Sequence, residues 1–169
     1  MFIEYLDGKK HAGRRADVSD SHEPFKDAGW VLDDNDYVID IDDLPKETIQ
    51  ELINFFNIKT QIVWTPRGCH LYFKKPSNFK RGANRTSPLG FKYEIKHKGN
   101  TRSVTIKQDG ELREIENFGI REEAPFVFSS NKIVTREEFE SKEEAVQHRK
   151  RYCETMDYDK CPIYKRKMR

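Results

Sequence analysis

The sequence has no apolar run long enough to cross a membrane. A membrane-spanning helix needs roughly 18 or more consecutive apolar residues, and no run of that length occurs in the 169 residues. The first five residues, Met-Phe-Ile-Glu-Tyr, lack the basic segment followed by an apolar one that marks a secretory signal. Cysteine is scarce, and three thiols without an export signal do not favour a disulfide framework. We therefore expect a cytoplasmic protein with no part in a membrane.

Two further absences narrow the class of protein. No Gly-Lys-Ser/Thr phosphate loop is present, which excludes a P-loop helicase within this sequence. The net charge is only +2, so the chain is not a polycation. Basic residues are nevertheless concentrated between residues 74 and 90, where no acid occurs, whereas acids gather between residues 33 and 43. Separation of charge of this kind is typical of a site where a metal and a polyanion meet.

The acidic segment contains an alternating pattern, Tyr-Val-Ile-Asp-Ile-Asp, over residues 37–42. Side chains two residues apart on a strand point the same way, so Asp40 and Asp42 project together while Ile39 and Ile41 face the opposite side. Two neighbouring carboxylates repel each other unless a cation lies between them. Carboxylate oxygens suit Mg²⁺ or Mn²⁺. The pattern therefore predicts a metal-binding strand.

The rest of the sequence predicts one helix followed by several strands. Residues 45–56 carry apolar side chains at i, i+3, i+4 and i+7 after a proline, which is typical of an amphipathic helix. A hairpin is expected around Asp109 and Gly110, and two capping-box patterns predict a helical tail after residue 134. This order indicates an α+β fold, an antiparallel sheet with helices on one face. Strands are expected at residues 29–32, 37–42, 61–64, 69–73, 91–96, 103–107, 112–115 and 126–128.

Three polar elements lie on these predicted strands: the aspartate pair, then His70, then Glu94 with Lys96. If the strands are neighbours in one sheet, their polar faces converge into one cleft. Carboxylates that hold metals, together with positive groups that grip phosphates, are what phosphoryl transfer requires. The sequence therefore favours an enzyme that acts on nucleotides or nucleic acid.

The same segments resemble the archaeo-eukaryotic primase superfamily, in particular the prim-pol domains of phages and plasmids. Residues 38–42, Val-Ile-Asp-Ile-Asp, resemble its first motif. Residues 65–73, Thr-Pro-Arg-Gly-Cys-His-Leu-Tyr-Phe, resemble its second, in which a histidine follows a glycine turn. Residues 90–96, Gly-Phe-Lys-Tyr-Glu-Ile-Lys, are similar to its third. The resemblance spans roughly residues 29–130.

The resemblance implies a catalytic core related to the RNA-recognition-motif fold, an antiparallel sheet with flanking helices, at residues 1–134. A helical extension with a basic end would follow at residues 135–169. It also implies template-directed nucleotide addition in phage or plasmid DNA replication, inside a bacterial or phage-infected cell. The expected partners are a single-stranded DNA template, NTP or dNTP, and a replicative helicase, fused or separate.

The resemblance also implies roles for individual residues. Asp40, Asp42 and Glu94 would hold two Mg²⁺ or Mn²⁺ ions, and His70 would contact the triphosphate of the incoming nucleotide. The expected phosphate-binding residues are His70, Lys96, Arg67, Lys10 and Arg14. The expected nucleic-acid-binding residues are Lys74, Lys75, Lys80, Arg81 and Arg85.

Two alternatives stay open. The first is a metal-dependent nuclease, because Glu94-Ile-Lys96 fits an acid-x-Lys signature; however, no Asp lies between Asp43 and Asp109 to serve as its usual upstream partner. The second is a non-catalytic module like an RNA-recognition motif, which would need exposed aromatic side chains on its central strands.

The third motif departs from the family, because it carries Glu94 where aspartate is common.

Overall fold

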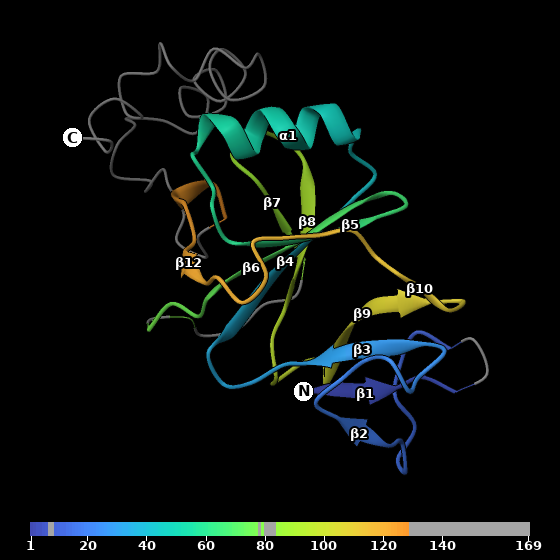
Figure 1. The fold of residues 1–169 in the computed structure, drawn as a ribbon. Helices are drawn as coiled ribbons and strands as arrows, with labels where there is room; N and C mark the ends of the chain where they lie inside the picture. The colour runs from blue at the N-terminus through green and yellow to red at the C-terminus, as the bar shows by residue number, and fades with distance from the viewer. Residues whose placement is uncertain (7–8, 78, 80–83, 129–169) are drawn as a thin grey trace, which may run out of the picture.

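The computed structural model of the protein describes residues 1–6, 9–77, 79 and 84–128. In this part, the chain forms two sheets and one α-helix in three layers (Figure 1). The helix forms the first layer, a seven-stranded sheet the second and a five-stranded sheet the third. The predicted helical extension at residues 135–169 and the boundary at residue 134 lie outside the described residues. No helix in the described part is long and apolar enough to span a membrane.

The seven-stranded sheet, called the large sheet below, carries the acidic strand at its centre. Its strand order is β11-β5-β6-β4-β8-β7, with β12 added in parallel to β6 and all other pairs antiparallel. Its strands are β4 (Asp36–Asp42), β5 (Gln61–Thr65), β6 (Gly68–Lys74), β7 (Asn84–Thr86), β8 (Lys92–Lys96), β11 (Ile115–Glu116) and β12 (Glu122–Glu123).

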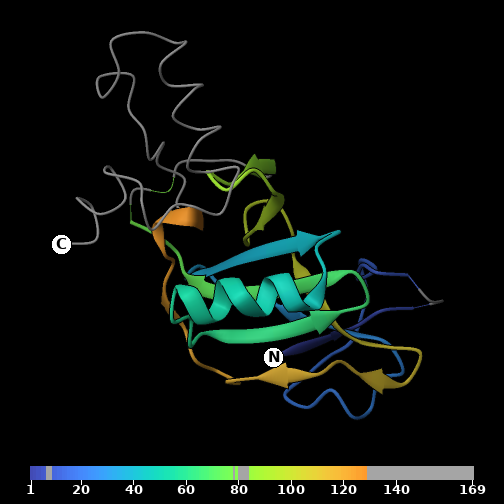
Figure 2. The same ribbon diagram turned by 90° about the horizontal axis from the view of Figure 1, so that it is seen from above.

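Helix α1 (Lys46–Phe55) covers one face of the large sheet (Figure 2). Its buried side chains, Ile49, Leu52 and Ile53, belong to the apolar stripe that the sequence predicts. Ile49 and Ile53 pack in one core with Ile39 and Ile41 of β4, both of which are fully buried. The predicted helix is therefore confirmed, and the apolar face of β4 packs against it.

The five-stranded sheet, called the small sheet below, packs against the opposite face of the large sheet. A second apolar core joins them and includes Val38, Val63 and Tyr72 from the large sheet and Phe2, Val104 and Ile106 from the small one. The strand order of the small sheet is β10-β9-β3-β1-β2. Its strands are β1 (Phe2–Glu4), β2 (Val18–Ser19), β3 (Ala28–Val31), β9 (Ser103–Gln108) and β10 (Glu111–Leu112).

The structure corrects two expectations about the fold. The expected antiparallel sheet with a helix on one face is confirmed, but the described residues also form a second sheet and contain one α-helix where flanking helices were expected. The strand predicted at residues 126–128 is also wrong, because Phe126–Phe128 forms a 3-10 turn, η1. Val127 and Phe128 are both fully buried in the core beneath α1. A strand would point these neighbours to opposite faces.

The predicted hairpin turn at Asp109 and Gly110 is confirmed between β9 and β10, but the second strand, expected at residues 112–115, ends at Leu112. Both turn residues have positive φ, 54° for Asp109 and 86° for Gly110. Two consecutive positive φ values are required by the tight turn that best matches the twist of paired strands. The chain then leaves the small sheet and pairs with the large one at β11, where Ile115 lies opposite Val63.

Candidate functional site

Three polar residues form a row across adjacent strands of the large sheet. Asp40 on β4 lies directly opposite His70 on β6 and directly opposite Glu94 on β8. Residues paired in this way have Cβ atoms about 4.5–5.5 Å apart. Asp42 follows Asp40 by two residues and therefore projects from the same face. The sheet thus places all four side chains together, on the face towards the small sheet, because Val38 on that face packs in the second core.

Local sequence explains why β4 can carry this row. Ile39 and Ile41 pack in the core under α1, so Asp40 and Asp42, which alternate with them, project from the opposite face. Gly68 lies opposite Asp42, and a side chain there would clash with the carbonyl oxygen of Ile41. The glycine therefore lets the strand that carries His70 approach β4 closely at the acidic end.

Asp40 is buried beside a lysine and a histidine. Its Oδ2 lies 3.0 Å from Lys96 Nζ, and its Oδ1 lies 3.3 Å from His70 Nε2, with 9% of the side chain exposed. Burial alone raises the pKa of the Asp40 carboxyl, but the His70 imidazole and the Lys96 ammonium outweigh it and lower that pKa to about 2. Asp40 is therefore a carboxylate at neutral pH despite its burial.

Lys96 bridges two of the acids. Its Nζ donates to Glu94 Oε2 at 2.7 Å as well as contacting Asp40. Burial lowers the pKa of Lys96, but the hydrogen bond to Glu94 and the charge of Asp40 more than compensate, so that pKa lies above its usual value. The ammonium therefore serves as the cation between these carboxylates in the ligand-free protein.

Two buried atoms in the row lack hydrogen-bond partners: Asp40 Oδ1 and His70 Nδ1. The contact between Asp40 Oδ1 and His70 Nε2 has the distance of an ion pair, but its geometry does not make a hydrogen bond. A buried polar atom without a partner costs roughly 1–3 kcal/mol. Such atoms are uncommon in folded proteins, and a water molecule, a bound ion or a catalytic role can account for them.

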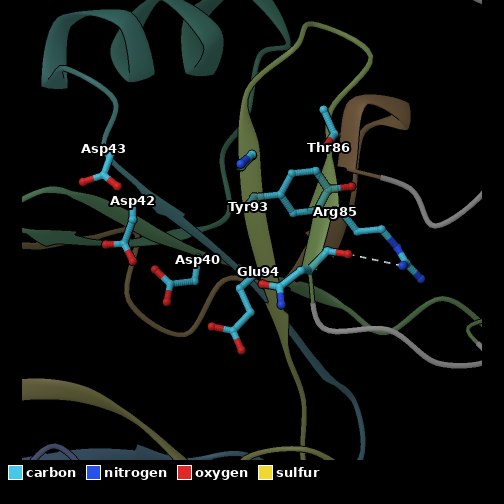
Figure 3. Close-up of a pocket in the computed structure, with 9 residues that line it drawn as sticks. Asp40, Asp42, Asp43, Arg85, Thr86, Tyr93 and Glu94 are labelled. Atoms are coloured by element: carbon cyan, nitrogen blue, oxygen red, sulfur yellow. Dashed lines mark hydrogen bonds between the residues drawn. The ribbon is translucent and has the colours of Figure 1, made fainter.

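Two cavities meet at the aspartate pair. The first, of about 500 Å³, lies between the aspartates and strands β7 and β8, and we call it the acidic cavity. Figure 3 shows the carboxylates of Asp42, Asp40 and Glu94 following one another along it, with Arg85 and Tyr93 on the far side. Asp43 also borders this cavity, so four carboxylates stand against the two basic side chains of Arg85 and Lys92, a balance that favours a cation or a group that arrives with one.

The second cavity, of about 450 Å³, lies between the two sheets, and we call it the basic cavity. His70 borders it although only 6% of that residue is exposed. Hydroxyl groups of Ser103 and Thr105 on β9 also border it. Its basic side chains are Lys10, Arg67, His70, Lys96 and Arg113, against the two carboxylates of Asp40 and Asp42. This balance favours a polyanion.

The structure brings most of the expected site residues together. Asp40, Asp42, His70, Glu94 and Lys96 share one face of the large sheet, as described above. Arg67 and Lys10 border the basic cavity, and Arg85 borders the acidic one. The Arg67 guanidinium lies 3.4 Å from Asp42 Oδ1 and 3.6 Å from Asp43 Oδ1.

Other expected residues lie elsewhere. Lys74 pairs with Asp36 at the opposite end of β4 from Asp42, roughly 20 Å away along the strand. Lys75 follows it, and Arg14 is exposed; none of these three borders either cavity. Lys80 and Arg81 lie outside the described residues.

The row has the right chemistry for a divalent ion but is not arranged as a finished metal site. Carboxylate oxygens are the preferred ligands of Mg²⁺ and Mn²⁺, and Asp40 Oδ1 has no hydrogen-bond partner. In the part of the chain that the structure describes, however, no three His, Cys, Asp or Glu side chains are grouped closely enough to hold a metal. Lys96 occupies the place between Asp40 and Glu94, so an ion at that place requires its ammonium to move.

Sequence reasoning missed the contribution of the small sheet, namely Ser103, Thr105 and Arg113. These residues belong to no motif. A signal was available for two of them, because Ser103 and Thr105 alternate with the apolar Val104 and Ile106 on one strand.

Comparisons of the chain with protein-family models, curated proteins and solved structures find no match.

Proposed function

We propose that the protein is a primase-polymerase, which transfers a nucleotide from NTP or dNTP to the 3′-hydroxyl of a primer on single-stranded DNA. The observation that carries this proposal is the row of Asp40, His70 and Glu94 across three strands, with Asp42 and Lys96 beside it. The row lies where an acidic and a basic cavity meet. Such a junction suits a reaction between a hydroxyl group and a polyphosphate.

The topology supports the same proposal. Strands β4 and β5 are joined through α1 and both flank β6, which gives the order β5-β6-β4-β8. The chain order β4-α1-β5-β6 matches the first part, β-α-β-β, of the β-α-β-β-α-β core expected of an RNA-recognition motif, and the second helix of that core has no counterpart among the described residues. Primases of the resembled superfamily are built on such a core, here with the small sheet as an addition.

In this proposal each acidic or basic group has a defined task. Asp40, Asp42 and Glu94 hold the divalent ions, while His70 and Lys96 bind phosphate oxygens. Mg²⁺ or Mn²⁺, when bound, would neutralise the triphosphate and lower the pKa of the primer hydroxyl. The 3′-oxygen forms a bond to the α-phosphorus, the hydroxyl proton passes to water, and the bond to the bridging oxygen breaks to release pyrophosphate. Lys96 leaves Asp40 and Glu94 as the phosphates arrive.

The side chains of the central strands favour an enzyme over a non-catalytic binding module. A module like an RNA-recognition motif stacks bases on exposed aromatic rings. The aromatic residues of β4 and β6, namely Tyr37, Tyr72 and Phe73, are all fully buried. The face of β4 towards the small sheet carries Asp40 and Asp42 instead, which would repel a nucleic acid in the absence of a cation.

Primer extension tests the proposal. The protein is incubated with Mn²⁺ or Mg²⁺, labelled nucleotides and a primed or unprimed single-stranded template. We expect extension, and we expect Asp40→Asn combined with Asp42→Asn to reduce it by about a hundred-fold or more, since both changes remove metal-binding charge. Asp34→Asn is the matched control, because Asp34 is exposed and paired with Lys98 away from the site.

The other outcomes separate the alternatives. Shortening of the labelled strand would indicate a nuclease, and binding without any chemistry would indicate a module. Extension that persists at the wild-type rate in the double variant would refute the site assignment.

A further inference from the structure

We infer that Arg113, supplied by the small sheet, binds the phosphates of the incoming nucleotide in the basic cavity. The inference rests on the proposed function and adds to it a residue from outside the three motifs. It also divides the two cavities between the reactants: the basic one receives the triphosphate, which leaves the acidic one for the primer end.

The backbone of Arg113 is held in place at the point where the chain crosses between the sheets. It directly follows β10, and its N–H donates to the carbonyl oxygen of Ile106 at 2.8 Å. Two residues later the chain joins the large sheet, where Ile115 pairs with Val63. Arg113 is therefore tied to both sheets and lies at the wall of the cavity between them.

The guanidinium is oriented as well. Its Nη1 donates to the carbonyl oxygen of Thr105 at 3.0 Å. A guanidinium has five N–H donors, and this bond uses one of them. The others are available to a planar or tetrahedral anion, for which arginine is well suited because two parallel hydrogen bonds can form at once.

No carboxylate lies within ion-pairing distance of Arg113 among the described residues, although the charges of Asp40 and Asp42 nearby favour its charged form. The carboxylates that border the basic cavity are already engaged: Asp40 by His70 and Lys96, and Asp42 by Arg67. Burial lowers the pKa of Arg113, which reflects the cost of placing this charge in the cleft. A bound phosphate would offset that cost, so an anion is the ligand that the residue lacks.

The size and the charge of the basic cavity together suit a nucleotide. Small-molecule sites usually enclose about 300–1,000 Å³, and the basic cavity falls in this range at about 450 Å³. Residues of both sheets border it, and its basic side chains outnumber its carboxylates. The cavity also shares Asp40 and Asp42 with the acidic cavity, so a triphosphate here would lie beside the carboxylates.

The test measures how Arg113→Gln and Arg113→Lys change the affinity for two probes in the presence of Mg²⁺. One probe is a nucleoside triphosphate with a methylene bridge between the α and β phosphorus atoms, and the other is inorganic tripolyphosphate. Hydrogen bonds to charged groups are stronger than those between neutral groups, so we expect Arg113→Gln to lower the affinity for both probes by about ten- to a hundred-fold. Arg113→Lys keeps the positive charge, so its affinity for the probes should fall by a smaller factor. Arg102→Gln is the matched control, because Arg102 is exposed and borders neither cavity.

The steady-state readout is the KM for the nucleotide, which should rise in Arg113→Gln while the KM for the primer stays unchanged. Wild-type affinity for both probes in a folded Arg113→Gln protein would overturn the inference. So would a loss confined to the nucleoside triphosphate, which would indicate contact with the base or sugar. If Arg113→Gln does not fold, Arg113→Lys decides the question by the same comparison.

Failure of the inference and failure of the proposed function give different results. Extension by the wild type with an unchanged nucleotide KM in Arg113→Gln would refute the inference about Arg113 and leave the proposed function standing. Absence of extension together with Arg113-dependent binding of tripolyphosphate would remove the polymerase proposal and leave the anion site.

Discussion

The positive charge of Lys96 offsets the negative charges of two carboxylates in the site in the absence of a ligand. Its ammonium lies 3.0 Å from Asp40 Oδ2 and 2.7 Å from Glu94 Oε2. At an effective dielectric constant of 20, opposite unit charges 3 Å apart attract each other by about 5 kcal/mol, and solvent weakens the attraction to the more exposed Glu94. The same ammonium that prevents the two carboxylates from repelling each other therefore competes with a divalent ion for them.

We accordingly predict that Lys96→Met binds Mn²⁺ more tightly than the wild type, by about ten-fold or more. The change removes the competing charge and keeps most of the side-chain volume. Titration of Mn²⁺ followed by electron paramagnetic resonance measures the affinity directly. Nucleotide addition should fall in the same variant, because a phosphate-binding group is lost. Lys98→Met, which removes an exposed lysine paired with Asp34, is the control. Weaker Mn²⁺ binding in Lys96→Met would contradict the competition.

The sequence predicted the types of residue in the row, but it could not predict Arg113. Asp40, Asp42 and Glu94 stand in alternating segments, where a period of two fixes which side chains share a face. Arg113 has no such context, because it lies just beyond a two-residue strand. Its role depends on where the chain crosses between two sheets, and that crossing is a property of the tertiary structure.

At the scale of secondary structure, the contact between β4 and β6 positions the site. The two strands pair over the whole length of β4, from Asp36 opposite Lys74 to Asp42 opposite Gly68. Gly68 begins β6, and its Cα approaches the Ile41 carbonyl so closely that no Cβ fits. A backbone carbonyl cannot move aside as a side chain could, so this approach requires glycine.

Gly68→Ala should therefore separate the strands at their acidic end. We expect the free energy of unfolding to fall by about 1–3 kcal/mol, the usual cost of overpacking, and nucleotide addition to fall with it as His70 moves from Asp40. Chemical denaturation measures the first effect and primer extension the second. Gly13→Ala is the control, because a Cβ at Gly13 meets nothing within 4 Å. A variant as stable as wild type would show that the strands can adjust to the methyl group.

The elements that sequence patterns predicted well are those with several turns or alternations. The stripe of α1 and the alternation of β4 and β6 extend over at least seven residues each. Most strands of the small sheet and its neighbours are only two to four residues long, as in β1, β2 and β10. A pattern with a period of two cannot be recognised in so few residues, so β1 and β2 were not predicted, and nothing indicated that the strands predicted at residues 29–32 and 103–107 would form a separate sheet with them.

At the scale of the whole molecule, the candidate site is assembled from two sheets that share a core. Val38, Val63 and Tyr72 of the large sheet pack against Val104 and Ile106 of the small one. Residues of both sheets border the basic cavity, among them His70 and Lys96 of the large sheet and Ser103, Val104 and Thr105 of the small one. The register that places Asp40 opposite both His70 and Glu94 arises from pairing between segments about 25 to 55 residues apart. No local pattern specifies that pairing, which is why the sequence could only suggest that the polar faces converge.

A ligand that fills the basic cavity should therefore join the two sheets and stabilise both. At a concentration 100 times its Kd, a ligand that binds only the folded state adds about 2.7 kcal/mol, which corresponds to a rise of about 5–10 °C in Tm for a domain of this size. We predict such a rise with Mg²⁺ and the methylene-bridged nucleoside triphosphate, together with slower amide hydrogen exchange in β4 and β6 and also in β9. The Asp40→Asn, Asp42→Asn double variant should show little of either effect. Protection confined to the large sheet would contradict the assignment, because Thr105 and Arg113 would then face an empty cavity while the nucleotide bound elsewhere along the acidic row.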